Sequence, residues 1–143
     1  MAERKHILIA EDEERMRQSV EILLEWKGYH VSAVANGKEA LNIIIGLTGD
    51  KKPVDLLITD IQMPQMDGME LIDEIRKSGA VLPVIAITGS RDVSIRDSLL
   101  KKNCSHCLFK PFEKDELLNS IKAVIEEAEL AINMGNKLLI KQK

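Results

Sequence analysis

Five short apolar runs, each followed by residues with helical periodicity, constrain the fold of this 143-residue chain more than any other feature. The three clearest runs are Ile7 to Ala10, Val54 to Ile58 and Val84 to Ile87. Runs of this length and composition fit strands that are covered on both faces, as in a parallel sheet. Two weaker runs, Tyr29 to Ala35 and Cys104 to Phe109, complete the set.

Apolar residues recur at helical spacing after each run. Met16, Val20, Leu23 and Leu24 mark one face of a helix that Gly28 would end. The later stripes are Ala40, Ile43, Ile44 and Leu47 after Asn36-Gly37; Ile72 and Ile75 after an Asp67–Glu70 capping box; Val93, Leu99 and Leu100 after Ser90; and Leu117, Ile121, Val124, Ile125, Ala128 and Ile132. Five alternating strands and helices predict an α/β fold with a doubly wound, open parallel sheet.

The pattern predicts one domain with a short appendage. Residues 1–128, which hold the five pairs of strand and helix, are expected to form the domain. Residues 129–143 are expected to be a C-terminal helix extension or the start of a linker. Gly135-Asn136 predicts a helix stop, which favours a short packed tail over a dimerising helix.

Composition argues against nucleic-acid and membrane partners. The formal net charge is -3, and the most basic stretch is the short tail with Lys137, Lys141 and Lys143. Direct binding to nucleic acid would need a larger basic patch. No stretch approaches the roughly 20 apolar residues of a membrane helix, and the N-terminus does not read as a signal peptide. These features predict a cytoplasmic protein.

The two cysteines, Cys104 and Cys107, form a single Cys-x-x-Cys around His106. A structural zinc site needs about four ligands, and the chain has no second pair. If Cys104 to Phe109 is a strand, residues three apart point to opposite faces, so the two thiols are expected to diverge. The pattern therefore favours two packed thiols over a metal or redox site.

Charged and hydroxyl side chains follow four of the five runs. Glu11 and Asp12 come after the first strand, Asp60 after the third, Thr88 after the fourth and Lys110 after the fifth. The carboxyl ends of parallel strands share one edge, and ligands of doubly wound sheets bind beyond that edge. Each residue alone would be an ordinary loop or cap residue. Their joint occurrence at one edge predicts a functional site.

Acids after the first strand replace the glycine-rich turn that a dinucleotide site would need. Two carboxylates about 4 Å apart repel by about 4 kcal/mol at an effective dielectric near 20, so Glu11, Asp12 and Asp60 together call for a counter-ion. Oxygen ligands favour Mg²⁺. Such an ion could orient a phosphoryl group for attack by Asp60, which would form an acyl phosphate.

Four segments, ILIAEDEE, DLLITDIQMPQMDGMEL, PVIAITGS and LFKPF, together resemble the response-regulator receiver family over about Lys5 to Glu127. The resemblance implies a flavodoxin-like (βα)5 sheet of strand order 2-1-3-4-5, in a signalling phospho-acceptor of two-component systems rather than an enzyme. It implies the following roles: Asp60 as phospho-acceptor, Asp12, Asp60 and the Gln62 main-chain carbonyl as Mg²⁺ ligands, Glu11 acting mostly through water, Lys110 contacting the phosphoryl group, and Thr88 as the switch.

The resemblance also implies partners and a switching face. A sensor histidine kinase or phosphotransfer protein would supply the phosphoryl group, a small acyl phosphate could replace it, and a downstream protein or output domain would read the change. Homodimers are a further possibility. The fourth helix has the least regular stripe and is expected to shift with its flanking strand and helix. A cis peptide is expected at Lys110-Pro111.

Two departures from the family pattern concern the switch. Cys107 stands three residues before Lys110, where the family usually has Tyr or Phe, and Phe109 is expected to face the other way. Output by ring rotation is therefore not expected. Gln62 and Ser90 occupy the two variable positions beside the phosphoryl site and should tune its lifetime.

Two alternatives remain. One is a degenerate receiver that binds proteins without phosphorylation. The other is a haloacid-dehalogenase-like phosphatase, which also uses a strand-end Asp and Mg²⁺. Such phosphatases carry a second Asp two residues after the nucleophile, where this chain has Gln62.

Overall fold

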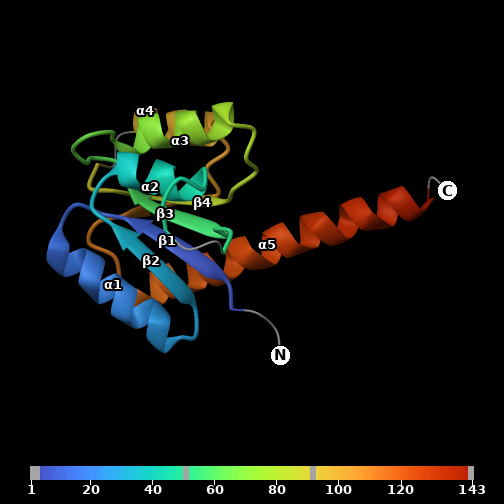
Figure 1. Cartoon of the computed structure of the whole chain (residues 1–143), viewed down its shortest axis with the longest axis horizontal. Coiled ribbons are helices and arrows are strands. Elements are labelled where there is room, and N and C mark those ends of the chain that lie inside the picture. The colour runs from blue at the N-terminus through green and yellow to red at the C-terminus, as the bar shows by residue number, and fades with distance from the viewer. Residues whose placement is uncertain (1–3, 50–51, 91–92, 142–143) are drawn as a thin grey trace.

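The computed structural model describes residues 4–49, 52–90 and 93–141, and side chains as far as residue 135. Strands and helices alternate along these residues (Figure 1). The elements are β1 (His6–Ala10), α1 (Glu14–Trp26), β2 (His30–Val34), α2 (Gly37–Ile44), β3 (Leu56–Asp60), α3 (Gly68–Lys77), β4 (Val84–Thr88), α4 (Val93–Lys101), β5 (His106–Phe109) and α5 (Lys114–Lys141).

The five strands form one parallel sheet in the order β2-β1-β3-β4-β5. This order is that of the flavodoxin-like doubly wound fold, so the fold class and the strand order expected from sequence are both confirmed. Every residue of β1, β3 and β4 is buried, as expected for strands covered on both faces. The edge strands β2 and β5 are only partly buried, which explains their weaker apolar runs.

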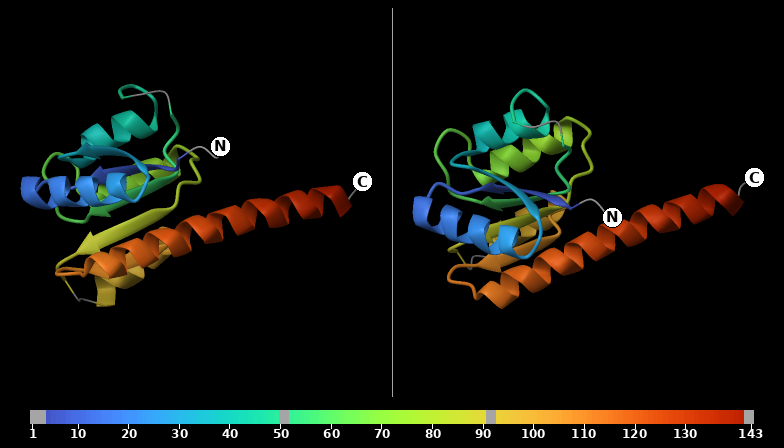
Figure 2. Two further views of the ribbon diagram at one scale, coloured as in Figure 1. Left: turned by 90° about the horizontal axis from the view of Figure 1, so that it is seen from below. Right: turned by 60° about the horizontal axis from the view of Figure 1, so that its bottom comes forward.

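Two apolar layers enclose the sheet, because alternate strand residues point to opposite faces. On one face, Ile7, Ile9 and Ile58 pack against α1 and α5. On the other, Leu8, Leu57 and Ala86 pack against α2, α3 and α4. Figure 2 shows α2 and α3 on one side of the sheet and α1 and α5 on the other. The strand ends thus lie between two packed helical layers.

Helix ends follow local sequence chemistry. Gly28 follows α1 with a φ of 96°, a left-handed conformation that glycine adopts without strain. Asn36 and Asp67 cap α2 and α3, since their side-chain oxygens accept the amide protons of Glu39 and Glu70 at 2.9 Å. For α4, which begins at Val93, the expected cap at Ser90 depends on residues outside the described part of the chain.

The predicted helix stop at Gly135-Asn136 is wrong. α5 runs from Lys114 to Lys141 without interruption, and its last turns project away from the sheet (Figure 1). Glycine lowers helix propensity by about 1 kcal/mol relative to alanine but does not by itself end a helix. Among the described residues, no helix has the length and apolar character needed to cross a membrane.

Candidate functional site

The carboxyl edge of the sheet carries the residues that sequence analysis singled out. Asp60 and Thr88 are the last residues of β3 and β4, Glu11 directly follows β1, and Lys110 directly follows β5. Parallel strand order places these ends side by side, with β3 in the middle of the sheet. The expectation that they share one edge is confirmed.

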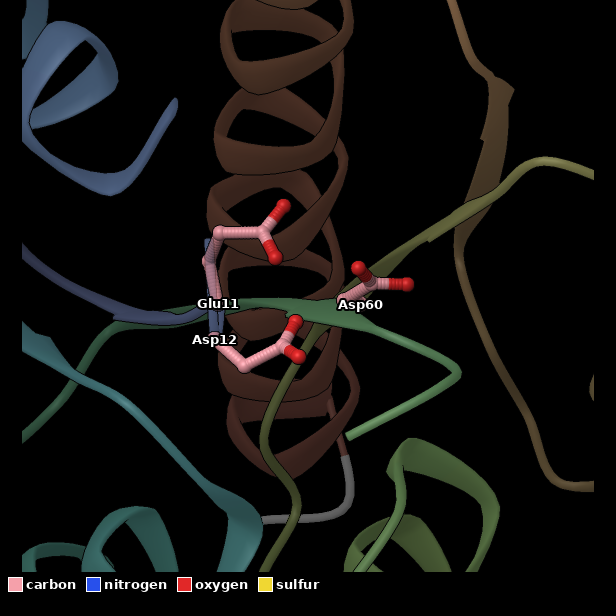
Figure 3. Close-up of side chains that lie close together, drawn as sticks. All are labelled: Glu11, Asp12 and Asp60. Carbon is pink, nitrogen blue, oxygen red and sulfur yellow. The ribbon is translucent and has the colours of Figure 1, made fainter. Parts of the chain in front are cut away.

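Glu11, Asp12 and Asp60 form an acidic cluster whose ligand oxygens lie within 4.8 Å of one another (Figure 3). Glu11 and Asp60 are 3% and 6% exposed, whereas Asp12 is open to solvent. It is the only such group of three or more potential metal-ligating side chains in the described part of the chain. Clustered carboxylate oxygens suit a hard divalent cation such as Mg²⁺, so the residues present fit that ion.

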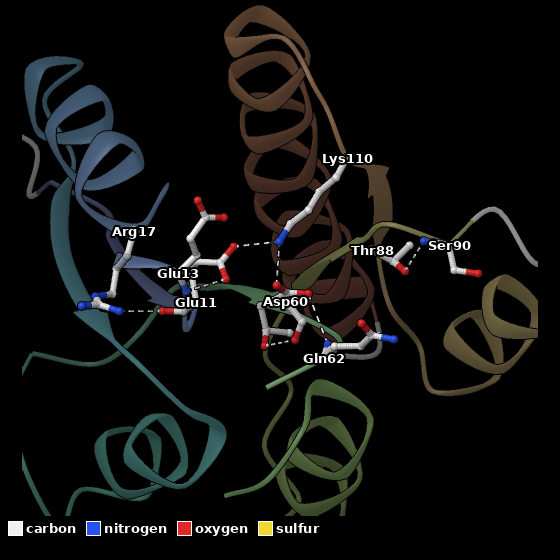
Figure 4. Close-up of polar contacts among 9 residues, drawn as sticks. Glu11, Glu13, Arg17, Asp60, Gln62, Thr88, Ser90 and Lys110 are labelled. Atoms are coloured by element: carbon white, nitrogen blue, oxygen red, sulfur yellow. Dashed lines mark hydrogen bonds and ion pairs between the residues drawn. The ribbon is translucent and has the colours of Figure 1, made fainter. Parts of the chain in front are cut away.

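Lys110 connects two members of the acidic cluster. Its Nζ donates to Asp60 Oδ2 at 2.7 Å and to Glu11 Oε1 at 3.1 Å (Figure 4). The peptide bond between Lys110 and Pro111 is cis, as the family resemblance implied. One ammonium therefore contacts two of the three carboxyl groups in the acidic cluster.

Burial raises the pKa of Glu11 to about 7, and the hydrogen bond and negative charge of Asp60 act in the same direction. The amide of Glu13 and the ammonium of Lys110 oppose this shift. For Lys110, burial lowers the pKa, but the contacts with Asp60 and Glu11 outweigh burial and raise it overall. Lys110 therefore stays charged at neutral pH, while Glu11 lies near the midpoint of its titration.

Main-chain groups orient the two buried carboxylates. The amide of Gln62 donates to Asp60 Oδ1 at 3.2 Å, and the amide of Glu13 donates to Glu11 Oε2 at 3.2 Å. Arg17 Nη1 binds the Glu11 main-chain oxygen at 2.9 Å (Figure 4). The side chain of Gln62 is exposed, so its main-chain atoms rather than its amide group are engaged with Asp60.

Gly68 supports the site but was not among the residues predicted from sequence. Its amide donates to the Ile61 carbonyl at 2.8 Å, and a Cβ placed there would lie 2.3 Å from the Asp60 carbonyl oxygen. Only glycine lets the start of α3 approach Asp60 this closely. One feature of the sequence could have pointed to Gly68. It directly follows the Asp67 cap, and capping does not by itself require a glycine there.

Thr88 lies at the same edge, but its side chain contacts its own loop rather than the acidic cluster. The Thr88 hydroxyl oxygen accepts the amide proton of Ser90 at 3.0 Å (Figure 4), and the residue is 4% exposed. Thr88 is therefore held by its own loop, on the β4 side of Asp60.

Two expectations about β5 are wrong. Cys104 precedes the strand, and both Cys104 and Cys107 pack in the apolar layer with α3 and α4 rather than diverging. Cys107 and Phe109 also share a face of β5, since they are two positions apart and Leu108, the one residue between them, packs in the layer opposite Cys107. Burial raises the pKa of Cys104 to about 11, as expected for a packed thiol.

Comparison with known proteins gives one consistent family. The family model described as the response regulator receiver domain matches residues 7–122. The response regulator MprA of Mycolicibacterium vanbaalenii is 33% identical over 119 residues, which cover 83% of this chain and 49% of that protein. The chain thus spans about half the length of the curated relatives that it matches.

Two solved structures resemble the fold over most of the chain. The response regulator TrrA of Thermotoga maritima, in complex with Mg²⁺ and BeF, is 32% identical with a TM-score of 0.71, covering 84% of this chain and 98% of that one. A DNA-binding response regulator of the LuxR family from Staphylococcus aureus is 28% identical with a TM-score of 0.75, covering 85% and 98%. That protein is described as DNA-binding, so this comparison conflicts with the expectation, drawn from charge alone, that nucleic acid is not a partner.

Proposed function

The chain belongs to the response regulator receiver family, a family of signalling domains, and we propose that Asp60 is its phospho-accepting residue. The observation that carries this proposal is the arrangement around Asp60. Its carboxylate lies between Lys110, a cation able to pair with a phosphoryl oxygen, and two further acids that together suit a divalent metal.

The acidic cluster would hold Mg²⁺ through Asp12, Asp60 and the main-chain carbonyl of Gln62, with Glu11 acting mostly through water. When bound, the ion would offset the negative charge of the incoming phosphoryl group. Support comes from the donor set itself, and from the relative that was crystallised with Mg²⁺ and BeF.

In the proposed reaction, a carboxylate oxygen of Asp60 forms a new bond to phosphorus while the bond from phosphorus to the donor breaks. The donor is a phosphohistidine of a sensor histidine kinase or phosphotransfer protein, or a small acyl phosphate. The electron pair of the broken bond stays with the donor. Lys110 is already within 2.7 Å of Asp60, so it can pair with a phosphoryl oxygen by a small rotation of its flexible stem.

Phosphorylation would act on output through Thr88 and α4. A phosphoryl group adds a charge of about -1.5 to -2 and new acceptor oxygens beside β4. Thr88 would exchange its contact with Ser90 for one with the phosphoryl group, which would favour a different arrangement of α4, β5 and the start of α5. Cys107 cannot supply the ring of the usual aromatic switch residue, so Thr88 would act without it. Gln62 and Ser90 would tune the phosphoryl lifetime.

The proposed setting is cytoplasmic two-component signalling. Residues 1–128 would be the receiver domain, and 129–143 a helical extension that could lead into an output domain, as the greater length of the curated relatives suggests. Downstream, a protein partner or that output domain would read the altered face.

Intact-mass spectrometry after incubation with acetyl phosphate and Mg²⁺ tests the proposal. One added phosphoryl group is expected on the wild-type chain and none on Asp60→Asn. Asp67→Asn is the matched control, since Asn also caps helices and Asp67 lies outside the acidic cluster, so this variant should be labelled normally. Labelling that persists in Asp60→Asn would overturn the assignment. No labelling of any variant, also by a phosphorylated kinase, would favour the alternative of a degenerate, phosphorylation-independent interaction module.

A further inference from the structure

The last part of α5 extends beyond the domain that the helix packs against. Val124 is its last fully packed residue, yet the helix continues to Lys141 (Figures 1 and 2). Most of the stability of a helix in a protein comes from the packing of its apolar face. The extension, residues 125–141, therefore needs an explanation in terms of what covers it.

The apolar stripe of α5 continues along the extension. Leu117, Ile121 and Val124 are buried against the sheet, and Ala128, Ala131, Ile132 and Gly135 follow on the same face at spacings of three and four residues. Ile132 is 64% exposed, although it continues a stripe whose earlier members are almost inaccessible. Leu130 lies on the opposite side of the helix, two residues from Ile132.

A groove lies between this stripe and the loop before β4. Its volume is about 730 Å³, and it is lined by Val81, Pro83, Ala128, Ala131 and Ile132 among others. Val81 is 99% exposed on the far wall. Leu130 does not line the groove. An apolar groove beside an apolar helical stripe has the shape that accepts a second amphipathic helix.

Two polar contacts link the helix to the domain where it leaves the domain. Lys5 Nζ pairs with Glu129 at 3.4 Å, and His106 Nε2 lies 3.8 Å from Glu127. These two acids are on opposite flanks of the apolar stripe. The groove is therefore bounded by a helix that is tied to the domain from two sides.

We propose that the occupant of the groove is the α5 extension of a second copy of this chain, paired antiparallel. Charge complementarity supports this choice. Residues 124–135 carry three acids, Glu126, Glu127 and Glu129, and no basic residue, whereas residues 136–141 carry Lys137 and Lys141 and no acid. A parallel pair would place like charges together, but an antiparallel pair places each acidic half beside a basic half. The two-fold symmetry then fills both grooves at once.

Sedimentation velocity of the full chain over a concentration series tests this arrangement. The wild type should dimerise, and Ile132→Glu and Val81→Glu should each weaken the dimer at least about tenfold, because both place a charge in a desolvated apolar contact. Leu130→Glu is the matched control on the opposite side of α5 and should leave dimerisation unchanged. A wild type that stays monomeric, or a dimer broken by Leu130→Glu but not by Ile132→Glu, overturns the proposal.

Charge reversal tests the orientation. Glu126→Lys with Glu127→Lys should weaken the dimer several-fold at low salt, and adding Lys137→Glu with Lys141→Glu should restore it. An antiparallel pair is contradicted if the first double variant dimerises as well as the wild type. The proposed dimer does not require phosphorylation, so Asp60→Asn should dimerise like the wild type. A failure of the dimer proposal would therefore leave the phosphorylation proposal standing, and the reverse also holds.

Discussion

The two ends of the sheet differ in the side chains that they bury and expose. At the carboxyl end, the ionisable residues Glu11 and Asp60 are almost fully buried, and Lys110 supplies one compensating cation. At the amino end, Val81 and Ile132 are exposed although they are apolar. Each end departs from the usual rule for its residue type, and such departures are the informative ones. The first departure supports the proposed cation site, and the second supports the proposed apolar partner.

The largest expected effect is a loss of phosphorylation at the carboxyl end of the sheet, with no change at the amino end. Lys110→Met keeps the length of the side chain but removes the ammonium that touches Asp60 and Glu11. We expect the rate of phosphorylation by acetyl phosphate to fall about a hundredfold, as for the loss of one charge-stabilising donor in an active site. Phosphorylation rates measured by intact mass would check this, while dimerisation should not change. A rate within a few-fold of the wild type would contradict the role of Lys110.

Gly68→Ala tests how tightly the carboxyl end is packed. A Cβ at this position would lie 2.3 Å from the Asp60 carbonyl oxygen, so backbone must shift. We expect the free energy of unfolding to fall by about 1–3 kcal/mol, the usual cost of overpacking. Urea denaturation would measure it. The matched control is Gly89→Ala at the same edge, where an added Cβ meets nothing within 4 Å, and equal losses in both variants would contradict the packing argument.

The pH dependence of Mg²⁺ binding tests the electrostatic environment of the carboxyl end. Because the pKa of Glu11 is raised to about 7, lowering the pH from 8 to 6 protonates this carboxyl and removes a negative charge beside the proposed ion. The deprotonated fraction falls about tenfold over this range, and Mg²⁺ affinity should weaken by up to that factor. Titration calorimetry at the two pH values would measure it. Glu11→Gln should show a flatter dependence, and an equally steep one would assign the effect to another group.

The smallest expected effect concerns the amino end. Gly135→Ala adds a methyl group where nothing lies within 4 Å and replaces glycine inside a helix. The extension should become more stable by about 0.5–1 kcal/mol, seen as slower amide exchange in the last turns of α5. Gly68→Ala should lower stability and Gly135→Ala should raise it. This difference would distinguish a crowded end of the molecule from an open one. Faster exchange in Gly135→Ala would contradict a continuous helix.

Local sequence signals were enough to predict the alternation of elements and the strand-end residues. Buried strands read as apolar runs because both of their faces are covered, and Asp60 and Thr88 were recognisable as the polar residues at the ends of such runs. The cap of α3 was visible in Asp67 for a similar reason, since capping depends on residues three positions away, whereas the Asn36 cap of α2 was interpreted only as a turn.

Errors arose where an outcome depends on distant contacts. The start of β5 at His106 rather than Cys104 placed both thiols in one apolar layer, which strand alternation applied from Cys104 could not show. The placement of Phe109 was a different error, because residues two apart on a strand share a face and this alternation could have been applied to the sequence. The need for glycine at position 68 arises from the Asp60 carbonyl, which belongs to another element.

By itself the sequence determined the α/β class, the family, and the carboxylates, hydroxyl and lysine that the strands deliver to one edge, because periodicity and strand-end chemistry act over a few residues. Only the tertiary structure decided the pairing of Lys110 with two acids, the raised pKa of Glu11 and the close approach of Gly68. It also decided how α5 leaves the domain and forms a groove with the loop at Val81. These features depend on distance and on the exclusion of water, which exist only once separate elements have packed together.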